Sequence, residues 1–219
     1  DSDKMAQNVY EYTKETIEKF QQTGVEIGMV QIGNEITNGM LGITTNRDAG
    51  ESYKGIWANE SKSKQVNKYL SAGSKAVKEV SDALVVLQLE TPNVKKFKEI
   101  MDTWERDDVY YDVLGSSYYP YWSTDKKANT PETLTKVQKL AADYGKLFVV
   151  LETSWLTTVK DADGTPNAVG EWENTSAYPL TAQGQANMLK DLYDTLGNQD
   201  NGLGAFYWEP AWIPVKAGW

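Results

Sequence analysis

The feature that most constrains the fold of this chain is a short apolar run that ends at a carboxylate, a pattern that occurs twice. Residues 30–33 lead directly to Asn34 and Glu35, and residues 147–151 lead directly to Glu152. Strands of a parallel sheet are buried on both faces and are therefore nearly continuous apolar runs. In a (β/α) barrel the functional groups lie where such strands end. The sequence thus predicts two buried parallel strands, each with a glutamate at its carboxyl end.

Segments with helical periodicity alternate with strand-like runs along the chain. Thr130 followed by Pro131 is typical of a helix start, and Thr181 is a second N-cap candidate. The segment from Thr37 to about Lys62 contains four glycines and an isolated tryptophan, and we expect it to be a loop over the strand end. The expected strands cover residues 25–34, 83–89, 112–120, 147–151 and 203–208. The expected helices cover residues 9–20, 66–80, 94–104, 131–144 and 182–196.

This alternation implies an α/β fold of right-handed βαβ units in a parallel sheet, either doubly wound or closed into a barrel. No glycine-rich nucleotide fingerprint lies between a strand and a helix. Four of the five strands end on or beside a glutamate, which favours the barrel. A closed barrel of this class has eight strands, so we expect residues 1–219 to be a single domain that supplies strands 4 to 8 of a (β/α)8 TIM barrel and lacks three N-terminal βα units. The four glutamates are Glu35, Glu90, Glu152 and Glu209.

The composition excludes several classes of chemistry. The 219 residues include no cysteine and no histidine, which rules out disulfides, thiolate metal sites and Ser-His or Cys-His nucleophiles within this chain. A net charge of −9 and a pI near 4.7 disfavour nucleic acid and anionic membranes as partners, and no apolar stretch is long enough to span a bilayer. The chain opens without an initiator Met or a leader, so we expect any signal peptide to have been removed or to lie outside it. Acid and base catalysis therefore falls to carboxylates or tyrosine.

Glu35 and Glu152 are the candidate catalytic residues. A retaining glycosidase needs one protonated carboxyl group and one ionised carboxylate, about 5 Å apart. Three βα units separate the two glutamates, so in a barrel they would face each other across the strand ends. A lone glutamate after a strand is more often an exposed acid at a loop edge, but two in this context favour catalysis. Glu90 and Glu209 are more readily explained as hydrogen-bonding or structural acids.

Polar side chains near the glutamates are candidate substrate contacts. Asn34 is placed to hydrogen-bond the 2-hydroxyl of a bound sugar, although a turn residue is the simpler explanation. Tyr118 or Tyr119 would donate a hydrogen bond to the nucleophile and keep it ionised, because alternation along a strand points one of them to the barrel axis. The sequence does not decide between the two tyrosines, and we prefer Tyr118.

Tryptophans follow several of the expected strands, where an aromatic face can stack on the apolar face of a pyranose ring. Core packing is the simpler explanation for any single tryptophan, and we assign Trp104, on a helical face, to the core. Four tryptophans at strand ends exceed that expectation and indicate sugar platforms. These four are Trp122, Trp155, Trp208 and Trp212.

A short acidic segment is a candidate calcium site. Asp161, Asp163, Thr165 and Asn167 place oxygen ligands at alternating positions around Gly164, and hard cations such as Ca²⁺ prefer oxygen. The segment lacks the bidentate glutamate and flanking helices of an EF-hand, and Asp-Gly turns are common without metal. From the residues alone, a calcium site and a plain turn are equal alternatives.

Four stretches of the chain together carry a family resemblance. They are residues 27–35 (IGMVQIGNE), 116–122 (SSYYPYW), 152–154 (ETS) and 204–215 (GAFYWEPAWIPV). In this order they resemble glycoside hydrolase family 53, the endo-β-1,4-galactanases (arabinogalactan endo-β-1,4-galactosidases) of the large retaining (β/α)8 clan. The likeness covers nearly the whole chain, and the last stretch is the most distinctive.

The resemblance implies a retaining enzyme that cleaves the β-1,4-galactan side chains of pectin. It implies that Glu35 ends the fourth barrel strand and is the acid/base, that Glu152 ends the seventh and is the nucleophile, and that Trp208 lines the −1 subsite. It also implies a structural Ca²⁺ loop as in bacterial members, although Thr165 stands where some members carry a histidine. Secretion by a bacterium, a polysaccharide partner and the absence of an organic cofactor are further implications.

The chain departs from the family pattern at its N-terminal side. Members begin with three further βα units that bring an arginine and a histidine toward the nucleophile, and neither segment is present. We therefore expect a portion of a larger enzyme. Two alternatives stay open: another retaining barrel glycosidase that acts on mannan, cellulose or xylan, and a non-catalytic galactan-binding protein that uses the tryptophan platforms.

Overall fold

Strands and helices alternate along the chain, as the sequence predicts. The computed structural model describes residues 1–122, 128–161, 164–165, 169 and 177–210. The strands of the larger sheet are hydrogen-bonded in the order β1-β4-β5-β6-β7, and the β1–β4 and β6–β7 pairs are parallel, which is the arrangement that βαβ units produce. These strands are β1 (Met29–Gln31), β4 (Leu84–Leu89), β5 (Val113–Tyr118), β6 (Leu147–Thr153) and β7 (Gly202–Tyr207).

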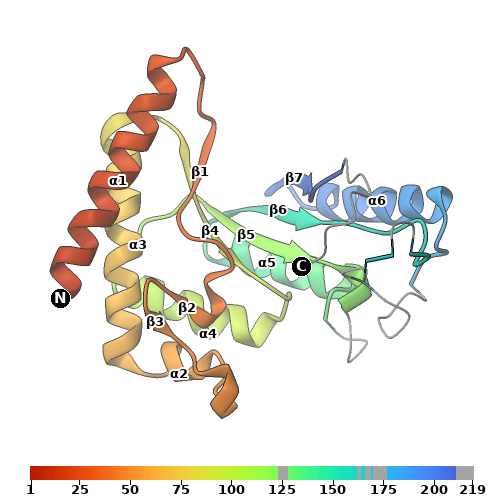
Figure 1. Ribbon diagram of the computed structural model, residues 1–219, viewed down its shortest axis with the longest axis horizontal. Coiled ribbons are helices and arrows are strands. Elements are labelled where there is room, and N and C mark those ends of the chain that lie inside the picture. Colours follow the sequence, from red (N-terminus) through yellow and green to blue (C-terminus); the bar gives the residue numbers. More distant parts are fainter. Residues whose placement is uncertain (123–127, 162–163, 166–168, 170–176, 211–219) are drawn as a thin grey trace. The chain divides into compact units, whose positions relative to one another are not determined.

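The chain divides into two compact units, whose elements are labelled in Figure 1. The first contains residues 1–90 and 95–115, and the second contains residues 91–94 and 116–219. The boundary falls within β5, whose first residues belong to the first unit and whose last residues belong to the second. The expectation that residues 1–219 form a single domain stays a prediction.

The helices begin where the sequence places their caps. The Thr130 hydroxyl accepts the backbone N–H of Thr133 at 3.1 Å, and the Thr181 hydroxyl accepts the N–H of Gly184 at 3.0 Å, so both predicted N-caps are confirmed. Within the described ranges, no helix has the length and apolarity that a bilayer crossing requires. The main helices are α1 (Ser2–Gln22), α3 (Glu60–Val80), α4 (Val94–Arg106), α5 (Pro131–Asp143) and α6 (Ala182–Gly197).

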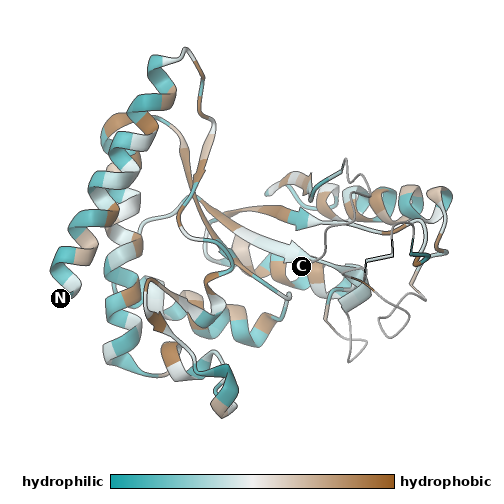
Figure 2. Ribbon diagram, in the orientation of Figure 1, coloured by the Kyte–Doolittle hydropathy of each residue, from teal (hydrophilic) through white to brown (hydrophobic). Residues whose placement is uncertain are grey.

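In the first unit α1 lies alongside α3 (Figure 1). Most of α1 is hydrophilic (Figure 2), and its buried residues are Ala6 and Ile17. The α3 helix also contacts the chain just after β1, because Gly73 leaves room for Ile32: a Cβ atom on Gly73 would lie 2.8 Å from Ile32 Cγ2. Removal of these apolar surfaces from water stabilises the unit and fixes β1 against α3.

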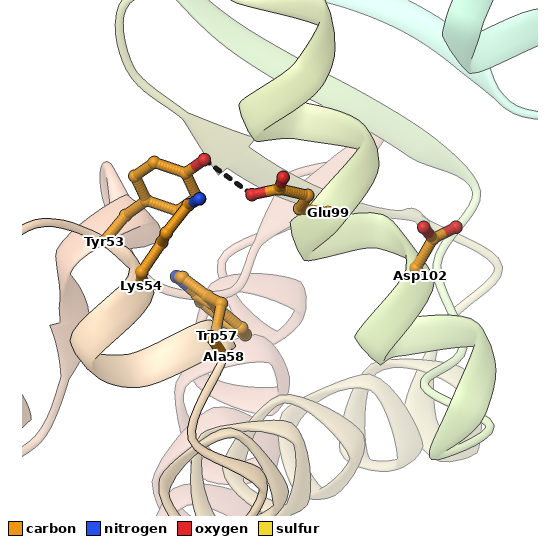
Figure 3. A pocket seen from close by; sticks show the side chains of 6 residues that line it. All are labelled: Tyr53, Lys54, Trp57, Ala58, Glu99 and Asp102. Carbon is orange, nitrogen blue, oxygen red and sulfur yellow. Dashed lines mark hydrogen bonds between the residues drawn. The ribbon is translucent and has the colours of Figure 1, made fainter.

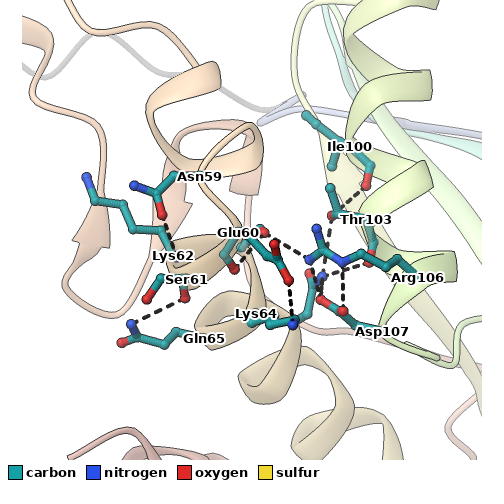
Figure 4. A network of polar contacts seen from close by, with 12 residues as sticks. Asn59, Glu60, Ser61, Lys62, Lys64, Gln65, Ile100, Thr103, Arg106 and Asp107 are labelled. Carbon is teal, nitrogen blue, oxygen red and sulfur yellow. Dashed lines mark hydrogen bonds and ion pairs between the residues drawn. The ribbon is translucent and has the colours of Figure 1, made fainter.

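A polar network joins α3 to α4 within the first unit. Asn67 is 1% exposed, and its amide donates to the Thr103 carbonyl at 2.9 Å and to Asp107 Oδ2 at 2.7 Å. Arg106 donates to the same Asp107 oxygen at 2.6 Å (Figure 4). The hydrogen bond from Arg106 lowers the pKa of Asp107, with a smaller contribution from Asn67, while burial acts in the opposite direction. The network therefore favours the ionised form of a partly buried carboxyl group.

The first strand is shorter than predicted. Val25 is half exposed, and residues 25–28 are not part of a strand. The partner strand β4 begins at Leu84, opposite Met29, so residues 25–27 have no ladder partner there. The prediction that the strand begins at Val25 is therefore wrong, because an apolar residue extends a strand only where a neighbouring strand pairs with it.

The segment from Thr37 to about Lys62 is not a plain loop, so that prediction is wrong. Gly39 and Gly42 adopt φ angles of 88° and 84°, which let the chain form the antiparallel β2–β3 hairpin. Trp57 is 4% exposed, and its Nε1 donates to the Thr37 carbonyl at 2.6 Å. The glycines mark turns between short ordered elements. These are η1 (Ile36–Asn38), β2 (Gly39–Met40), β3 (Ile43–Thr44), η2 (Arg47–Ala49) and α2 (Lys54–Trp57).

In the second unit β6 and β7 pack with α5 and α6 (Figure 1). The Gln138 amide on α5 donates to the Leu196 carbonyl on α6 at 2.9 Å, which ties the two helices together inside the core. Burial of apolar side chains from both helices and from β6 stabilises this unit. The buried residues include Leu134, Val137, Phe148, Val150, Met188 and Leu192.

Candidate active site

Glu35 lies in a tight turn that directly follows β1. The backbone N–H of Ile32, the residue after β1, donates to the Val86 carbonyl of β4 at 3.0 Å. Gly33 then adopts a φ of 75°, and Glu35 has a φ of 46° and a ψ of 52°. A left-handed backbone is unfavourable for a non-glycine residue and is common at functional sites. The Glu35 side chain is half-buried.

Buried amides surround the backbone of this turn. Gln88, at 0% exposed, accepts the Glu35 N–H at 3.1 Å through its Oε1 atom. The Gln31 amide donates to Gln88 Oε1 at 2.6 Å and to Asn34 Oδ1 at 3.1 Å. Asn34 itself is exposed, and because its Oδ1 atom accepts from Gln31, its NH₂ group is the donor that it could offer to a sugar hydroxyl.

Glu90 lies directly after β4 and is held by its neighbours. The Asn38 amide donates to Glu90 Oε1 at 3.2 Å, and Lys96 Nζ donates to the Glu90 carbonyl at 2.7 Å. Burial lowers the pKa of Lys96, while the carboxylates of Glu90 and Glu35 act in the opposite direction. These contacts agree with the expectation that Glu90 is a hydrogen-bonding acid. Glu209, after β7, is exposed.

Glu152 lies inside β6, at a point where the pairing with β7 is irregular. Val150 pairs with Ala205 and Thr153 pairs with Tyr207, so β6 uses one residue more than β7 over this interval. Such a bulge changes the direction of the side chains within it and is frequent next to active sites. The Tyr119 hydroxyl donates to Glu152 Oε2 at 3.0 Å. This contact restricts the orientation of the Glu152 carboxyl group.

The preference for Tyr118 as the partner of the nucleophile is wrong. Tyr118 is 1% exposed, and burial raises its pKa, with smaller contributions from Tyr178 and Asp191. Tyr119, which follows the last residue of β5, is the tyrosine that contacts Glu152. That alternation along the strand points the two tyrosines to different sides stays a prediction, and the sequence did not show which of them contacts Glu152.

The tryptophans predicted to be sugar platforms differ in how far they are exposed. Trp122 is 44% exposed and Trp208 is 46% exposed, so both present ring surface at strand ends. Trp155 is 1% exposed and packs against Tyr178 with ring centroids 5.4 Å apart, so the prediction of a platform is wrong for this residue. Its buried ring cannot stack on a sugar. Trp212 lies outside the described residues. Trp104 is 0% exposed, which confirms its assignment to the core.

Several supporting residues were missed by the sequence analysis. Gln31 and Gln88 are single polar residues in apolar strands, and that interruption was the available signal. Tyr207 accepts the Trp155 backbone N–H at 3.1 Å, and Gln185 donates to the Trp155 carbonyl at 2.6 Å. These contacts fix the chain that follows Glu152, and no local sequence pattern indicates them.

Glu35 belongs to the first unit and Glu152 to the second. The expected separation of about 5 Å between their carboxyl groups is therefore a prediction. What the structure provides is the local environment of each glutamate. Glu35 follows β1, which pairs in parallel with β4, and Glu152 is the penultimate residue of β6, which pairs in parallel with β7. A (β/α) barrel carries its catalytic groups at such strand ends.

The candidate calcium segment is only partly described. Asp161 Oδ1 accepts the backbone N–H of Gly164 at 2.7 Å, which is the Asp-Gly turn that the sequence suggests. Asp163 and Asn167 lie outside the described residues, and Thr165 is half-buried. The donor set is all oxygen and fits the chemistry of Ca²⁺. Elsewhere, over the part of the chain with assigned positions, no three acidic side chains come together in a way that could hold a metal ion.

A cavity of about 270 Å³ lies in the first unit between α2 and α4 (Figure 3). The Tyr53 hydroxyl donates to Glu99 Oε2 at 2.6 Å across it, and burial together with Glu99 raises the pKa of Tyr53 to about 12. None of the predicted catalytic or sugar-binding residues lines this cavity. The lining residues are Tyr53, Lys54, Trp57, Ala58, Glu99 and Asp102.

Comparisons with known proteins assign the chain to a family. The profile of glycosyl hydrolase family 53 matches residues 1–219. An endo-beta-1,4-galactanase of Bacillus subtilis is 39% identical over 94% of this chain and 44% of its own length, and an arabinogalactan endo-beta-1,4-galactanase of Cellvibrio japonicus is 29% identical over 99% of this chain and 55% of its own. The chain thus spans about half the length of the curated relatives it matches.

Solved structures agree with this assignment. The catalytic domain of a family 53 enzyme from Ignisphaera aggregans matches 98% of this chain and 56% of its own length, with a TM-score of 0.82 and 30% identity. A fungal β-1,4-galactanase matches 97% of this chain and 60% of its own with a TM-score of 0.77, and at 22% identity it supports the fold alone. The prediction of a partial (β/α)8 barrel is confirmed. The chain therefore belongs to glycosyl hydrolase family 53.

Proposed function

We propose that this chain is part of a retaining endo-β-1,4-galactanase that acts on β-1,4-galactan. The observation that carries the proposal is the placement of two glutamates at the ends of parallel strands in a member of this family, each with its own local support. Glu35 follows β1 in a constrained turn, and Glu152 on β6 accepts a hydrogen bond from Tyr119. Two carboxyl groups with different environments match the two roles that retaining glycoside hydrolysis requires.

In the proposed first step, a carboxylate oxygen of Glu152 attacks the anomeric carbon and forms a glycosyl-enzyme ester. The bond from this carbon to the leaving oxygen breaks, and the Glu35 carboxyl group donates its proton to that oxygen. In the second step Glu35 removes a proton from water, which attacks the anomeric carbon and releases Glu152. Two inversions give a product with retained configuration. The Tyr119 hydroxyl orients the Glu152 carboxyl group for this attack.

Asn34, Trp122 and Trp208 are the proposed sugar contacts among the described residues. Asn34 would donate to the 2-hydroxyl, a contact that strengthens in the transition state. The exposed rings of Trp122 and Trp208 offer faces for stacking on pyranose rings. Trp212 stays a candidate of the same kind, outside the described residues.

The experiment that tests the proposal compares this chain with the same chain extended to the full length of its relatives. Each is incubated with linear β-1,4-galactan, mannan, cellulose and xylan, and the products and the configuration of the first-released anomer are followed by NMR. Galacto-oligosaccharides with β configuration from the extended protein support the proposal. Cleavage of another polysaccharide in preference to galactan, or galactan binding without cleavage, would instead support one of the two alternatives.

We further propose that the protein acts outside the cell on pectin side chains, with a bound Ca²⁺ ion of structural role. Galactan is a polymer too large to enter a cell intact. Asp161, Asp163, Thr165 and Asn167 would hold the ion through oxygen atoms. The test is a thermal melt with and without EDTA: a lower midpoint in EDTA that added Ca²⁺ restores supports the ion, and identical curves contradict it.

A further inference from the structure

We propose that Gln31 and Gln88 are positioning residues that hold Glu35 and Asn34 in the orientation used for catalysis. This inference rests on the proposed acid/base role of Glu35 and deepens it. Neither glutamine is expected to touch the reacting atoms. Both would act through the backbone of the turn after β1 and through the side chain of Asn34.

The backbone at Glu35 needs support because its conformation is unfavourable. Its φ of 46° and ψ of 52° lie in the left-handed region, which is unfavourable for a non-glycine residue. A residue stays in such a conformation only where its surroundings determine it. Gly33, with a φ of 75°, allows the chain to enter the turn, but a glycine does not restrict the residues that follow it.

Gln88 supplies this support from the neighbouring strand. Its Oε1 atom accepts the Glu35 N–H at 3.1 Å and the Gln31 amide at 2.6 Å. The side chain is completely buried near the end of β4, in a run that is otherwise apolar. A buried amide is unfavourable unless it is hydrogen-bonded, so its position is fixed by the same contacts that fix Glu35.

Gln31 extends the arrangement to Asn34. Its Nε2 group donates to the Gly33 carbonyl at 2.7 Å and to Asn34 Oδ1 at 3.1 Å, in addition to Gln88. The Asn34 carbonyl oxygen is therefore engaged on the protein side, which leaves the NH₂ group directed to the other side of the amide. One pair of glutamines thus determines the orientation of both the proposed acid/base and the proposed 2-hydroxyl donor.

Neutral amides add no further charge to a site where Lys96 already interacts electrostatically with the Glu35 carboxylate. Glu35 must be protonated in the first step and ionised in the second, so a strong preference for either form would slow one of them. A hydrogen bond to the Glu35 N–H orients the residue without contacting its carboxyl group. The amides therefore fix geometry and leave proton transfer to the carboxyl group itself.

The test uses the extended enzyme with Gln88→Met, which removes both contacts while keeping the side chain's length. Gln138→Met is the matched control, because Gln138 is also a completely buried glutamine but lies on α5 of the other unit. The substrates are galactan and an aryl β-galactobioside whose phenol leaves without help from an acid. The value of kcat/KM reports the first step, in which only the galactan reaction needs the proton of Glu35.

We expect Gln88→Met to lower kcat/KM on galactan about 10- to 100-fold and on the aryl substrate less than about twofold, because misplacing a catalytic group affects only the step that uses it. Gln138→Met should leave both values unchanged. Equal losses on the two substrates, or no loss on galactan, would overturn the positioning role.

A second readout separates this inference from the proposed function. The Glu35 amide should exchange its hydrogen at least about tenfold faster in Gln88→Met than in the unsubstituted protein, since its acceptor is gone. If Gln88→Met does not fold, Gln31→Met, in the half-buried strand β1, is measured in its place on both substrates. If the unsubstituted extended enzyme cleaves no galactan, the proposed function fails. Independently of that result, an unchanged hydrogen-exchange rate of the Glu35 amide in Gln88→Met would overturn the positioning role.

Discussion

The two glutamates expected to do the chemistry are held by different means. Glu35 lies in a turn outside β1, with a left-handed backbone whose N–H is bonded to a buried amide of β4. Glu152 lies inside β6, at an irregular register, and its carboxylate accepts the Tyr119 hydroxyl. Tyr119 belongs to an aromatic cluster, with its ring centroid 4.7 Å from that of Trp122 and 5.5 Å from that of Tyr121.

This difference corresponds to the two proposed roles. A nucleophile must present one carboxylate oxygen to the anomeric carbon, and the Tyr119 hydroxyl fixes the orientation of the Glu152 carboxyl group. An acid/base changes its protonation state in each cycle, and the hydrogen bond at the Glu35 N–H restricts its orientation without contacting the carboxyl group. In the first unit, backbone geometry and amide side chains therefore hold Glu35. In the second unit, strand register and aromatic packing hold Glu152.

The largest expected effect comes from removing each carboxylate in turn. In the extended enzyme, Glu152→Gln should lower kcat/KM by at least about 10³-fold on both galactan and an activated aryl β-galactobioside, because both need the nucleophile. Glu35→Gln should cause a comparable loss on galactan and a much smaller loss on the aryl substrate. Steady-state kinetics with the two substrates measure this. The reverse pattern would exchange the two roles.

The next effect concerns stability in the turn before Glu35. Gly33→Ala forces a side chain into a backbone with a φ of 75° and places its Cβ 2.6 Å from Ile36 Cγ2. We expect a loss of about 2–4 kcal/mol in the free energy of unfolding, of which about 1–2 comes from the backbone and the rest from the clash. Urea denaturation of the 219-residue chain measures it.

Gly24→Ala is the matched control for this substitution. Gly24 has a φ of 83°, but nothing lies within 4 Å of the position that its Cβ would take. Its loss should be limited to the backbone contribution of about 1–2 kcal/mol. Equal losses for the two variants would mean that the contact with Ile36 does not constrain the turn. A constrained turn would then not distinguish the support of Glu35 from that of Glu152.

The sequence predicted the features of these two regions that depend on local signals, and it did not predict those that depend on distant segments. Periodicity located the five strands and the main helices, and cap residues fixed helix starts at Thr130 and Thr181, because these signals are local. The strand-end glutamates were equally visible. The start of β1 was not visible in the sequence. It depends on where β4 begins, and these two segments are far apart in the chain.

The details of the site required contacts that the sequence does not encode locally. The choice of Tyr119 over Tyr118 depends on the register of β5 against Glu152, and the burial of Trp155 depends on Tyr178 and Tyr207. The same is true of Gln88, whose role appears only when β4 is placed beside β1. The positions of the candidate residues near strand ends were thus predictable from the sequence, and the residues that contact them were not.

A smaller effect is expected from the hydroxyl that contacts Glu152. Tyr119→Phe in the extended enzyme should lower kcat about 10- to 100-fold, because a hydrogen bond to a charged group contributes about 1.5–3 kcal/mol. The control is Tyr121→Phe, which removes a 2.7 Å hydrogen bond with Ser154 in the same aromatic cluster. That variant should retain near-normal kcat. Equal losses would indicate that the cluster as a whole matters, rather than the contact with Glu152.

The smallest effect tests the dependence of the first unit on polar contacts. Arg106 lowers the pKa of Asp107, so the folded carboxyl group has a lower pKa than the unfolded one, which is about 3.9. Its stabilisation is therefore complete above that value and is lost as the pH falls through the folded pKa. Asp107→Asn should cost about 1 kcal/mol at neutral pH and progressively less below about pH 4.

The matched substitution in the second unit is Glu132→Gln. Glu132 also has a pKa lowered by a neighbouring cation, Lys136, but both side chains are exposed and screened by solvent. Urea denaturation at several pH values should show a pH-dependent difference from the unsubstituted chain for Asp107→Asn and almost none for Glu132→Gln. Amide exchange in α3 and α4 should increase only in Asp107→Asn, since the network joins these two helices. If both variants behave alike, the buried network contributes no more than a surface ion pair, and polar support in the first unit is confined to the turn at Glu35.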